Sequence, residues 1–246
     1  MLKLENLSFT VGEGEEKLTI IDNVNLEIED GVFTVVTGPN GGGKSTLARL
    51  IMGIEKPTSG KIYFNGEDIT ELNVTERARR GIGYAFQQPP RFKGLTVRKL
   101  LSLAHGSELP EDECCHYLTS VGLCSAEYLN REVNTSLSGG EAKRVEIATL
   151  MARDLKAAIF DEPEAGIDMW SFSMLVETFG AMSRADKSKT ILVISHQERI
   201  MQLADEIIII ADGKVSSKGP KDEIFPQIMG KFGEPCTFRG KGGGNQ

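Results

Sequence analysis

Apolar residues occur along this chain in two kinds of pattern. Short, nearly continuous apolar runs bounded by glycine or charged residues predict buried strands. These runs are 32–37, 82–86, 157–160, 190–194 and 207–210. Apolar residues that recur every three to four positions predict helices, as in 45–52 and 139–153. Strands and helices that alternate in this way are typical of an α/β protein with a parallel sheet flanked by helices.

Two stretches depart from that alternation. Residues 2–28 contain short strand patterns around the polar turn 12–16, which predicts an N-terminal antiparallel β-subdomain. Residues 88–153 are mostly helical in pattern, which predicts a helical subdomain inserted in the core. We therefore expect a single domain over residues 1–230, followed by a flexible, glycine-rich tail at 231–246.

The helix predicted at 139–153 has an apolar and a polar side. The residues at helical spacing that we expect in the core are Val145, Ala148, Thr149 and Ala152. The residues that we expect to face solvent are Lys143, Arg144 and Glu146.

Charge and hydropathy narrow the function classes. The net charge of −7 argues against general nucleic-acid binding. Seven basic residues between 77 and 99 form a local excess of positive charge, and most of them are expected to face solvent. The members from Arg91 onward are candidates for contact with a protein partner. The seven residues are Arg77, Arg79, Arg80, Arg91, Lys93, Arg98 and Lys99. No apolar run approaches the roughly 20 residues that span a bilayer, and no apolar leader precedes Leu2. The expected location is the cytoplasm.

A glycine-rich segment lies between the run at 32–37 and the helix at 45–52. It fits the pattern G-x-x-x-x-G-K-[ST] on a strand-to-helix turn, where backbone N–H groups converge on phosphate oxygens. Lys44 would neutralise the β- and γ-phosphates, and the hydroxyl of Ser45 would bind Mg²⁺. The predicted nucleotide-binding residues are Gly38, Pro39, Asn40, Gly41, Gly42, Gly43, Lys44, Ser45 and Thr46.

Two carboxylates, Asp161 and Glu162, follow the apolar run at 157–160 directly. They leave a buried strand where the phosphates are expected, and we expect them to differ in role. Asp161 would hold Mg²⁺, while Glu162 would polarise, or accept a proton from, the water that attacks the γ-phosphate.

A second helix start also suits an anion. Ser138 and Glu141 form a predicted capping box, with Ser138 as the N-cap. The box does not require Gly139 and Gly140, which leave the N–H groups of the helix N-terminus accessible. The chain therefore has two predicted phosphate-binding helix ends.

These residues, in this order and spacing, resemble the ATP-binding cassette (ABC) ATPases, from about Leu2 to Phe225. Residues 38–45 correspond to the Walker A loop, 137–141 to the signature motif and 157–162 to Walker B. The resemblance implies a P-loop NTPase fold of the ABC ATPase type with a mostly parallel, RecA-like core. It also implies ATP and Mg²⁺ as ligands, ATP hydrolysis, and an ATP-dependent homodimer or cassette pair.

Smaller motifs extend the resemblance. Gln87 corresponds to the Q-loop glutamine, which in the family contacts Mg²⁺ and the attacking water, and Gln88 is a weaker match. His196 corresponds to the switch histidine and Asp168 to the D-loop aspartate. The implied catalytic residues are Glu162, His196 and Gln87, and the implied metal ligands are Ser45, Gln87 and Asp161. The implied contacts of the signature motif to the nucleotide of the other copy are Ser138, Gly139 and Gly140, and Asp168 is a further implied nucleotide-binding residue.

One family feature is missing. Many members stack adenine on an aromatic residue late in the first strand, where this chain has Val11, and Phe9 is expected to point to the core. Base selectivity therefore stays open.

Within the family, local features resemble SufC, the ABC ATPase of iron–sulfur cluster assembly. They are the missing aromatic, the sequence 86–90 (FQQPP) and the acidic residues Glu141 and Glu146 of the signature helix. This resemblance implies a SufB-like scaffold protein as the partner, remodelled by ATP-driven dimerisation. Pro163 departs from it and is typical of transporters.

Two other functions stay open. One is the ATP-binding subunit of an ABC transporter, peripheral at the inner membrane face and docked on a membrane-spanning subunit. The other is a nucleotide-gated binding module without catalysis, which the presence of Glu162, His196 and Gln87 disfavours.

Overall fold

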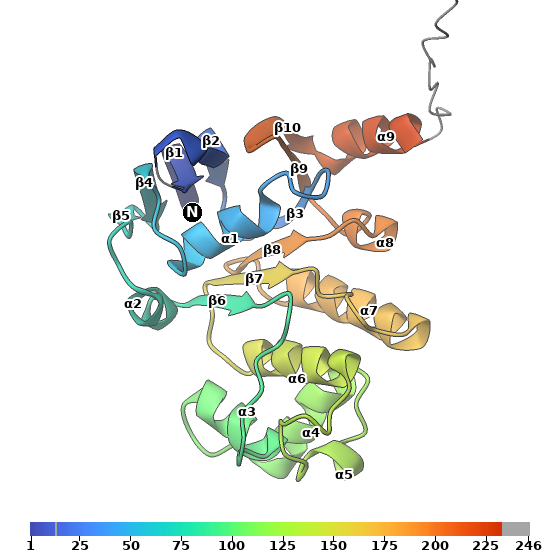
Figure 1. Ribbon diagram of the computed structural model, residues 1–246. Coiled ribbons are helices and arrows are strands. Elements are labelled where there is room, and N and C mark those ends of the chain that lie inside the picture. Colours follow the sequence, from blue (N-terminus) through green and yellow to red (C-terminus); the bar gives the residue numbers. More distant parts are fainter. Residues whose placement is uncertain (13, 233–246) are drawn as a thin grey trace, which may run out of the picture.

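The computed structural model describes residues 1–12 and 14–232, which form two sheets (Figure 1). The first has the order β2-β1-β4-β5, and all its pairs are antiparallel. Its strands are β1 (Leu2–Val11), β2 (Leu18–Ile28), β4 (Ser59–Phe64) and β5 (Glu67–Asp68). The second has the order β10-β9-β3-β8-β7-β6 and is parallel except for β10. Its strands are β3 (Phe33–Thr37), β6 (Ile82–Ala85), β7 (Ala157–Asp161), β8 (Thr190–Ile194), β9 (Glu206–Ala211) and β10 (Lys214–Pro220).

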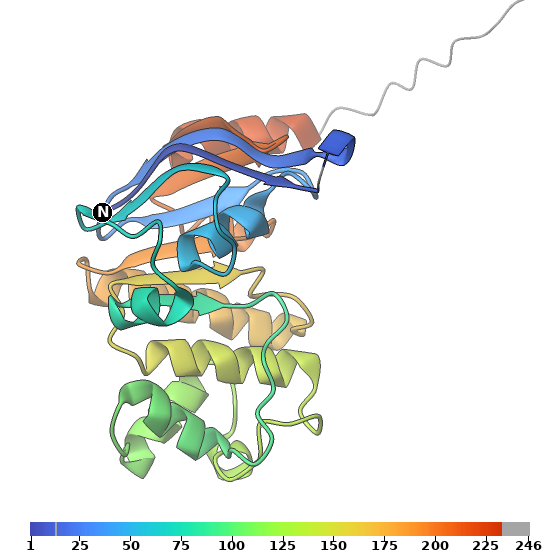
Figure 2. The same ribbon diagram turned by 60° about the vertical axis from the view of Figure 1, so that its left-hand side comes forward.

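Helices cover the parallel sheet and form a separate group between β6 and β7. They are α1 (Lys44–Met52), α2 (Val74–Arg79), α3 (Val97–His105), α4 (Glu111–Ser120), α5 (Ser125–Tyr128), α6 (Gly139–Met151), α7 (Met169–Ala185), α8 (Glu198–Met201) and α9 (Lys221–Phe232), with a 3₁₀ turn at Gly14–Glu16. Figures 1 and 2 show α3 to α6 gathered beside β6, while β1, β2 and β4 lie toward the other end of the sheet.

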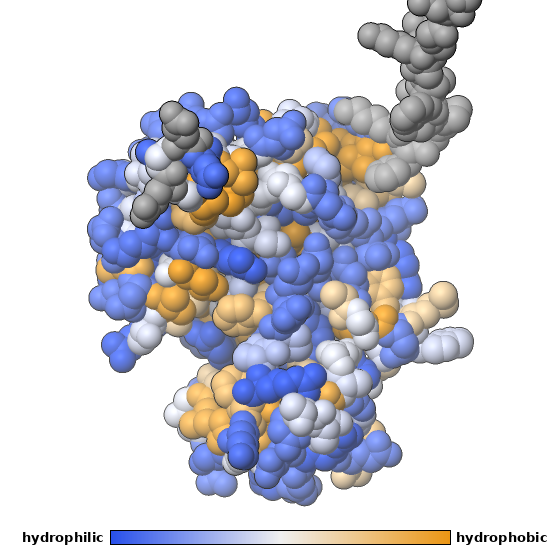
Figure 3. Space-filling model, in the orientation of Figure 1, coloured by the Kyte–Doolittle hydropathy of each residue, from blue (hydrophilic) through white to orange (hydrophobic). Residues whose placement is uncertain are grey.

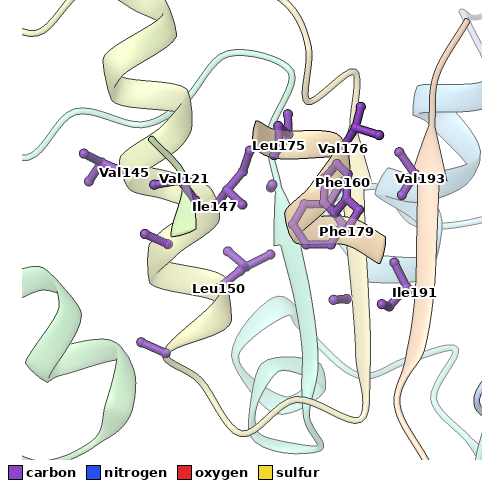
Figure 4. Packing of buried hydrophobic residues seen from close by; sticks show 14 of the residues in the cluster. Val121, Val145, Ile147, Leu150, Phe160, Leu175, Val176, Phe179, Ile191 and Val193 are labelled. Carbon is purple, nitrogen blue, oxygen red and sulfur yellow. The ribbon is translucent and has the colours of Figure 1, made fainter. Parts of the chain in front are cut away.

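The parallel sheet separates two apolar clusters, because successive strand residues point to opposite faces. On β3, Val35 belongs to one cluster and Val36 to the other. The first cluster contains the apolar side of α6 together with α7 and the inserted helices, with Phe160 and Phe179 in edge-on contact at 4.9 Å (Figure 4). The second contains the buried residues of α1 and the antiparallel sheet. Helices α1 and α6 therefore pack on opposite faces.

The predicted α/β fold is confirmed, including the antiparallel N-terminal strands and the helical insertion. The expected alternation of strands and helices is interrupted at β4 and again at β10, which follows β9 directly and pairs with it antiparallel. Strand β4 pairs with β1 instead of joining the parallel sheet. It forms a hairpin with β5 around Asn65 and Gly66, both with positive φ (51° and 80°), which suits a tight two-residue turn. The tail predicted for 231–246 lies outside the described residues from 233 onward, and 231 and 232 end α9.

Two exposure predictions are wrong. Lys143 and Glu146 are buried, although the polar side of α6 was expected to face solvent. Arg77 is also buried, because its guanidinium donates to the carbonyl oxygens of Leu50 and Ile51 at the end of α1. Helical periodicity treats charged positions as exposed, and it misses those whose partners come from distant segments.

The surface on the side shown in Figure 3 carries apolar patches separated by polar residues. None of the helices within residues 1–12 and 14–232 is long and apolar enough to cross a bilayer.

Candidate functional site

Four neighbouring strands of the parallel sheet carry the predicted site residues at their carboxyl ends. In the order β3-β8-β7-β6, the strands are followed by the glycine loop, His196, Glu162 and Gln87. Carboxyl ends of parallel strands share one edge of the sheet, where α/β proteins bind their ligands. The fold therefore brings residues that lie far apart in the sequence to a single edge.

The loop between β3 and α1 passes close to the backbone of other strands at two positions, and both positions require glycine. Gly38 has φ 133°, and a Cβ there would lie 2.0 Å from the carbonyl oxygen of Ile210. Gly43, the N-cap of α1, has φ 101°, and a Cβ there would lie 2.9 Å from the carbonyl oxygen of Ile20. The backbone is thus held against β2 and β9, and at these two positions no side chain stands between the backbone and a phosphate.

The Lys44 side chain folds back over this loop. Its Nζ donates to the carbonyl oxygens of Gly38 at 2.9 Å and Pro39 at 2.8 Å. Burial lowers the pKa of the Lys44 ammonium, and the nearby carboxylates of Glu162 and Asp161 oppose that shift. A cation is therefore held among backbone groups suited to phosphate.

Ser45 and Asp161 meet at the start of α1. The Ser45 hydroxyl donates to Oδ1 of Asp161 at 2.9 Å, and the Tyr84 hydroxyl donates to Oδ2 at 2.8 Å. Both oxygens of a fully buried carboxylate are thus fixed in direction. Hard oxygen donors of this kind suit Mg²⁺, which takes few protein ligands, so the residues present fit the predicted metal.

Tyr84 is a site residue that the sequence analysis missed. Burial and the Asp161 carboxylate both raise the pKa of its hydroxyl, which keeps it a hydrogen-bond donor. The available signal was a tyrosine inside a strand predicted to be buried, because a buried tyrosine hydroxyl needs a partner.

Glu162 and Gln87 are also in contact. Nε2 of Gln87 donates to Oε2 of Glu162 at 2.7 Å. Glu162 has a left-handed backbone (φ 45°), and its N–H donates to the carbonyl oxygen of Ile194 at 3.0 Å. A non-glycine residue adopts this conformation only when its surroundings hold it there, and such strain is common at functional sites.

His196 is exposed just beyond β8. Partial burial and the nearby Lys44 ammonium lower the pKa of its imidazole, while Glu162 opposes the shift. His196 is thus electrostatically coupled to the loop lysine and to Glu162, and the lowered pKa favours its neutral imidazole.

Ser195 joins the segments that follow β7 and β8. Its hydroxyl donates to Oε1 of Glu164 at 2.6 Å, and its oxygen accepts from the N–H of Gln197 at 3.0 Å. The other Glu164 oxygen is buried without a partner among the described residues, and burial raises the pKa of this carboxyl. The sequence analysis did not single out either residue.

The predicted capping box at the start of α6 is confirmed. The N–H of Glu141 donates to Oγ of Ser138 at 3.2 Å, and the N–H of Ser138 donates to Oε2 of Glu141 at 2.7 Å. The other carboxylate oxygen of Glu141 accepts from the Tyr128 hydroxyl. Gly139 faces open space, whereas a Cβ at Gly140 would lie 2.4 Å from the carbonyl oxygen of Gly166.

Asp168 caps α7. Its Oδ1 accepts from the N–H groups of Trp170 at 3.1 Å and Ser171 at 3.0 Å. These contacts explain the aspartate at this position within one chain. The predicted contact of Asp168 with a nucleotide stays a prediction.

A pocket of about 560 Å³ lies between the glycine loop and the start of β2. It is lined by Leu18, Thr19, Ile20, Gly41, Gly43, Lys44, Ser45, Thr46, Asp212 and Gly213. Leu18 is 63% exposed, and Val11, which is 38% exposed, is its partner in the β1–β2 pairing. An aliphatic pair thus lies near the phosphate loop in a chain that lacks the expected aromatic.

Comparison with known proteins agrees with this geometry. The family model described as ABC transporter matches residues 21–165, which include the glycine loop, Gln87, Ser138 and both strand-end carboxylates. The chain belongs to the ABC ATPase family.

Several ABC relatives are similar over most of this chain. An uncharacterised ABC transporter ATP-binding protein of Methanocaldococcus jannaschii is 40% identical over 242 residues, covering 94% of each chain. An energy-coupling factor transporter ATP-binding protein of Clostridium acetobutylicum is 34% identical, covering 92% of this chain and 82% of that protein. A sulfate/thiosulfate import ATP-binding protein of Synechocystis is 32% identical over 94% of this chain but only 65% of its own length.

The same fold occurs in solved structures. A dimeric bacterial ABC transporter cassette superposes with a TM-score of 0.81 at 28% identity, covering 90% of this chain and 99% of that one. A second structure, described as a dimeric post-hydrolysis state bound to ADP and Pi, gives a TM-score of 0.79 at the same identity.

Proposed function

We propose that this chain binds and hydrolyses ATP as the ATP-binding subunit of an ABC membrane transporter. The observation that carries the ATPase assignment is the paired contact at one sheet edge, Ser45 with Asp161 and Gln87 with Glu162. The relatives support the transporter assignment, because the proteins similar over most of this chain are named as transporter ATP-binding proteins.

The residues divide the work of phosphoryl transfer. The N–H groups of residues 40–46 and the Lys44 ammonium bind the phosphates, and Ser45 and Asp161 would hold Mg²⁺, which supplies positive charge to the phosphate oxygens when bound. Glu162 orients the attacking water and accepts its proton, with its carboxylate held by Gln87. His196, whose lowered pKa favours the neutral imidazole, donates toward the γ-phosphate oxygens.

Two copies are needed for a complete site. The phosphate-binding ends of α1 and α6 belong to helices packed on opposite faces of the parallel sheet. Ser138 and Gly139 of one chain therefore bind the nucleotide held by the loop of another. The dimeric form of the superposed cassettes supports this pairing.

The SufC-like hypothesis receives less support. The relatives reported above are named as transporter ATP-binding proteins. One feature behind that hypothesis, Glu146, also has contacts with Phe86 and Lys143 inside the same chain. Cluster assembly with a SufB-like scaffold therefore becomes the alternative, and the expected location becomes the inner membrane face.

The test is a pull-down of the tagged Glu162→Gln variant from native membranes in detergent with ATP. We expect a membrane-spanning partner, identified by mass spectrometry, that is lost when Lys44→Ala is added. Recovery of a soluble scaffold in its place would overturn the transporter assignment and favour cluster assembly.

A further inference from the structure

Two charged side chains on α6 reach across to the strand ends that carry the candidate catalytic residues. Nζ of Lys143 donates to the carbonyl oxygens of Phe86 and of Asp161, the latter at 3.1 Å. Oε1 of Glu146 accepts from the N–H of Phe86 at 2.9 Å. Oε2 of Glu146 lies 3.6 Å from Nζ of Lys143, so the two charges also pair with each other.

These contacts hold Phe86 from both sides of its backbone. The pairing of β6 with β7 ends at Ala85 and Phe160, so Phe86 lies one residue past the last paired position. A buried backbone N–H or C=O without a sheet partner needs another one. Glu146 supplies the acceptor and Lys143 the donor, and Gln87 is the next residue along the chain.

Lys143 also reaches the other half of the candidate site. Its second carbonyl partner belongs to Asp161, whose side chain contacts Ser45 and whose next residue is Glu162. One ammonium group therefore binds the backbone beside Gln87 and the backbone beside Glu162. The two side chains that meet at 2.7 Å are thus fixed to the same helix.

A contribution to stability does not by itself explain why Lys143 and Glu146 are buried together. Lys143 and Glu146 are both buried, and burial raises the pKa of the Glu146 carboxyl while Lys143 opposes the shift. Removing two charges from water is costly, and well-packed apolar residues of similar volume are often at least as stabilising. What apolar residues could not supply is the directed contact with Phe86 and Asp161.

The same helix begins at Ser138, the start of the signature motif. Lys143 lies five residues further along, less than one and a half turns of a continuous helix. Over that length a helix moves as a rigid body. A displacement of the Ser138 end therefore reaches both strand ends through these side chains.

We propose that Lys143 and Glu146 are positioning residues that set Gln87 and Glu162 relative to the signature helix. Contact of the signature end with a nucleotide thereby adjusts the catalytic pair of its own chain. This inference rests on the ATP hydrolysis in the proposed function, and it adds residues that do not touch the nucleotide.

The main test is the double variant Lys143→Met/Glu146→Leu, which leaves no unpaired buried charge. We expect a melting temperature near that of the wild type and an affinity for a fluorescent ATP analogue within about twofold. We expect kcat to fall by about tenfold or more, since small misplacements of catalytic groups have effects of this size. A kcat within twofold of wild type would overturn the proposal. A fall in kcat accompanied by comparable losses of nucleotide affinity and of melting temperature would also overturn it.

Single variants separate positioning from packing. Glu146→Gln keeps an oxygen that can accept from the N–H of Phe86, so it should retain several-fold more kcat than Glu146→Leu. Equal losses in the two would contradict the proposal. Thr149→Ala is the matched control on the same helix, because its hydroxyl donates to the carbonyl oxygen of Val145, one turn earlier, and to no strand end among the described residues.

A second readout needs no turnover. Amide hydrogen exchange of the segment 84–90 should become faster in the double variant, while exchange in α1 stays unchanged. Unaltered exchange in 84–90 would refute the coupling even if the wild-type protein proved inactive. Inactivity of the wild-type dimer would overturn the proposed function alone.

Discussion

The Gln87 side-chain amide and the Glu162 carboxylate form a hydrogen bond of 2.7 Å between residues that follow adjacent parallel strands. Glu162 is further held by its left-handed backbone and by its N–H bond to Ile194. Contacts within the chain therefore fix the direction of this carboxylate, as the role of a general base requires.

Substitution of Glu162 by glutamine should separate binding from hydrolysis. Loss of a general base typically lowers turnover by 10²- to 10⁴-fold, so we expect a decrease of at least about 100-fold. ATP affinity should persist, and a nucleotide-bound dimer should accumulate in size-exclusion chromatography. Glu198→Gln, at an exposed glutamate that begins α8, is the control and should hydrolyse normally. Near wild-type turnover in Glu162→Gln would remove this residue from the role of base.

Lys44→Ala should act on binding. The ammonium is the charged group that the glycine loop places among its own carbonyl groups, and its loss removes the main positive charge near the phosphates. We expect ATP affinity to fall by about tenfold or more in equilibrium titration. Lys56→Ala, at an exposed lysine paired with Glu71, should leave affinity unchanged. Equal affinities in the two variants would contradict the phosphate-loop assignment.

Ser138→Arg should block dimer formation while leaving ATP binding by the single chain intact. The arginine would place a bulky side chain at the exposed start of α6, where the nucleotide of the other copy is expected. Size-exclusion chromatography in the Glu162→Gln background would show a monomer with ATP. Ala126→Arg, an exposed position on α5, should still dimerise. A persistent dimer in Ser138→Arg would argue against a role of the signature motif between copies.

Glu164→Gln should change how stability depends on pH. Because burial raises the pKa of Glu164, the folded state binds this proton more tightly than the unfolded state. The stabilisation from this group is therefore greatest at acidic pH. It is lost as the pH rises above 4.5, the ordinary pKa of a glutamate carboxyl, and through the raised pKa of the folded chain. Glutamine keeps an acceptor for Ser195 without the buried charge, so it should stabilise by roughly 1 kcal/mol at pH 8.

That advantage should shrink toward pH 5, as measured by urea unfolding at both pH values. An equal gain in the free energy of unfolding at pH 5 and at pH 8 would show that the Glu164 carboxyl titrates alike in the folded and unfolded chains. Ser188→Ala, at a hydroxyl bonded to the half-buried Asp186, is a control without a fully buried carboxylate.

The local parts of the site could be predicted from the sequence, and the contacts between distant segments could not. The glycine loop, the Ser138 capping box and the strand-end carboxylates each lie within a few consecutive residues, so their spacing specifies their geometry. Tyr84 lies 77 positions from its partner Asp161. Lys143 lies 57 positions from Phe86, and an amphipathic pattern assigned it to solvent. Buried polar side chains with distant partners carry no periodic signal.

Arg77 is another buried polar side chain whose partners lie far away in the sequence, and its position affects the electrostatics of α1. A helix carries partial positive charge at its N-terminus and partial negative charge at its C-terminus. The guanidinium of Arg77 lies against the carbonyl groups that end α1 and so balances the negative pole of that helix from within the protein. The positive pole, at Gly43 and Lys44, receives no acidic residue in the first turn. The negative pole of α1 is thus compensated by a residue of α2, while at the positive pole the Asp161 carboxylate reaches the helix through the Ser45 hydroxyl.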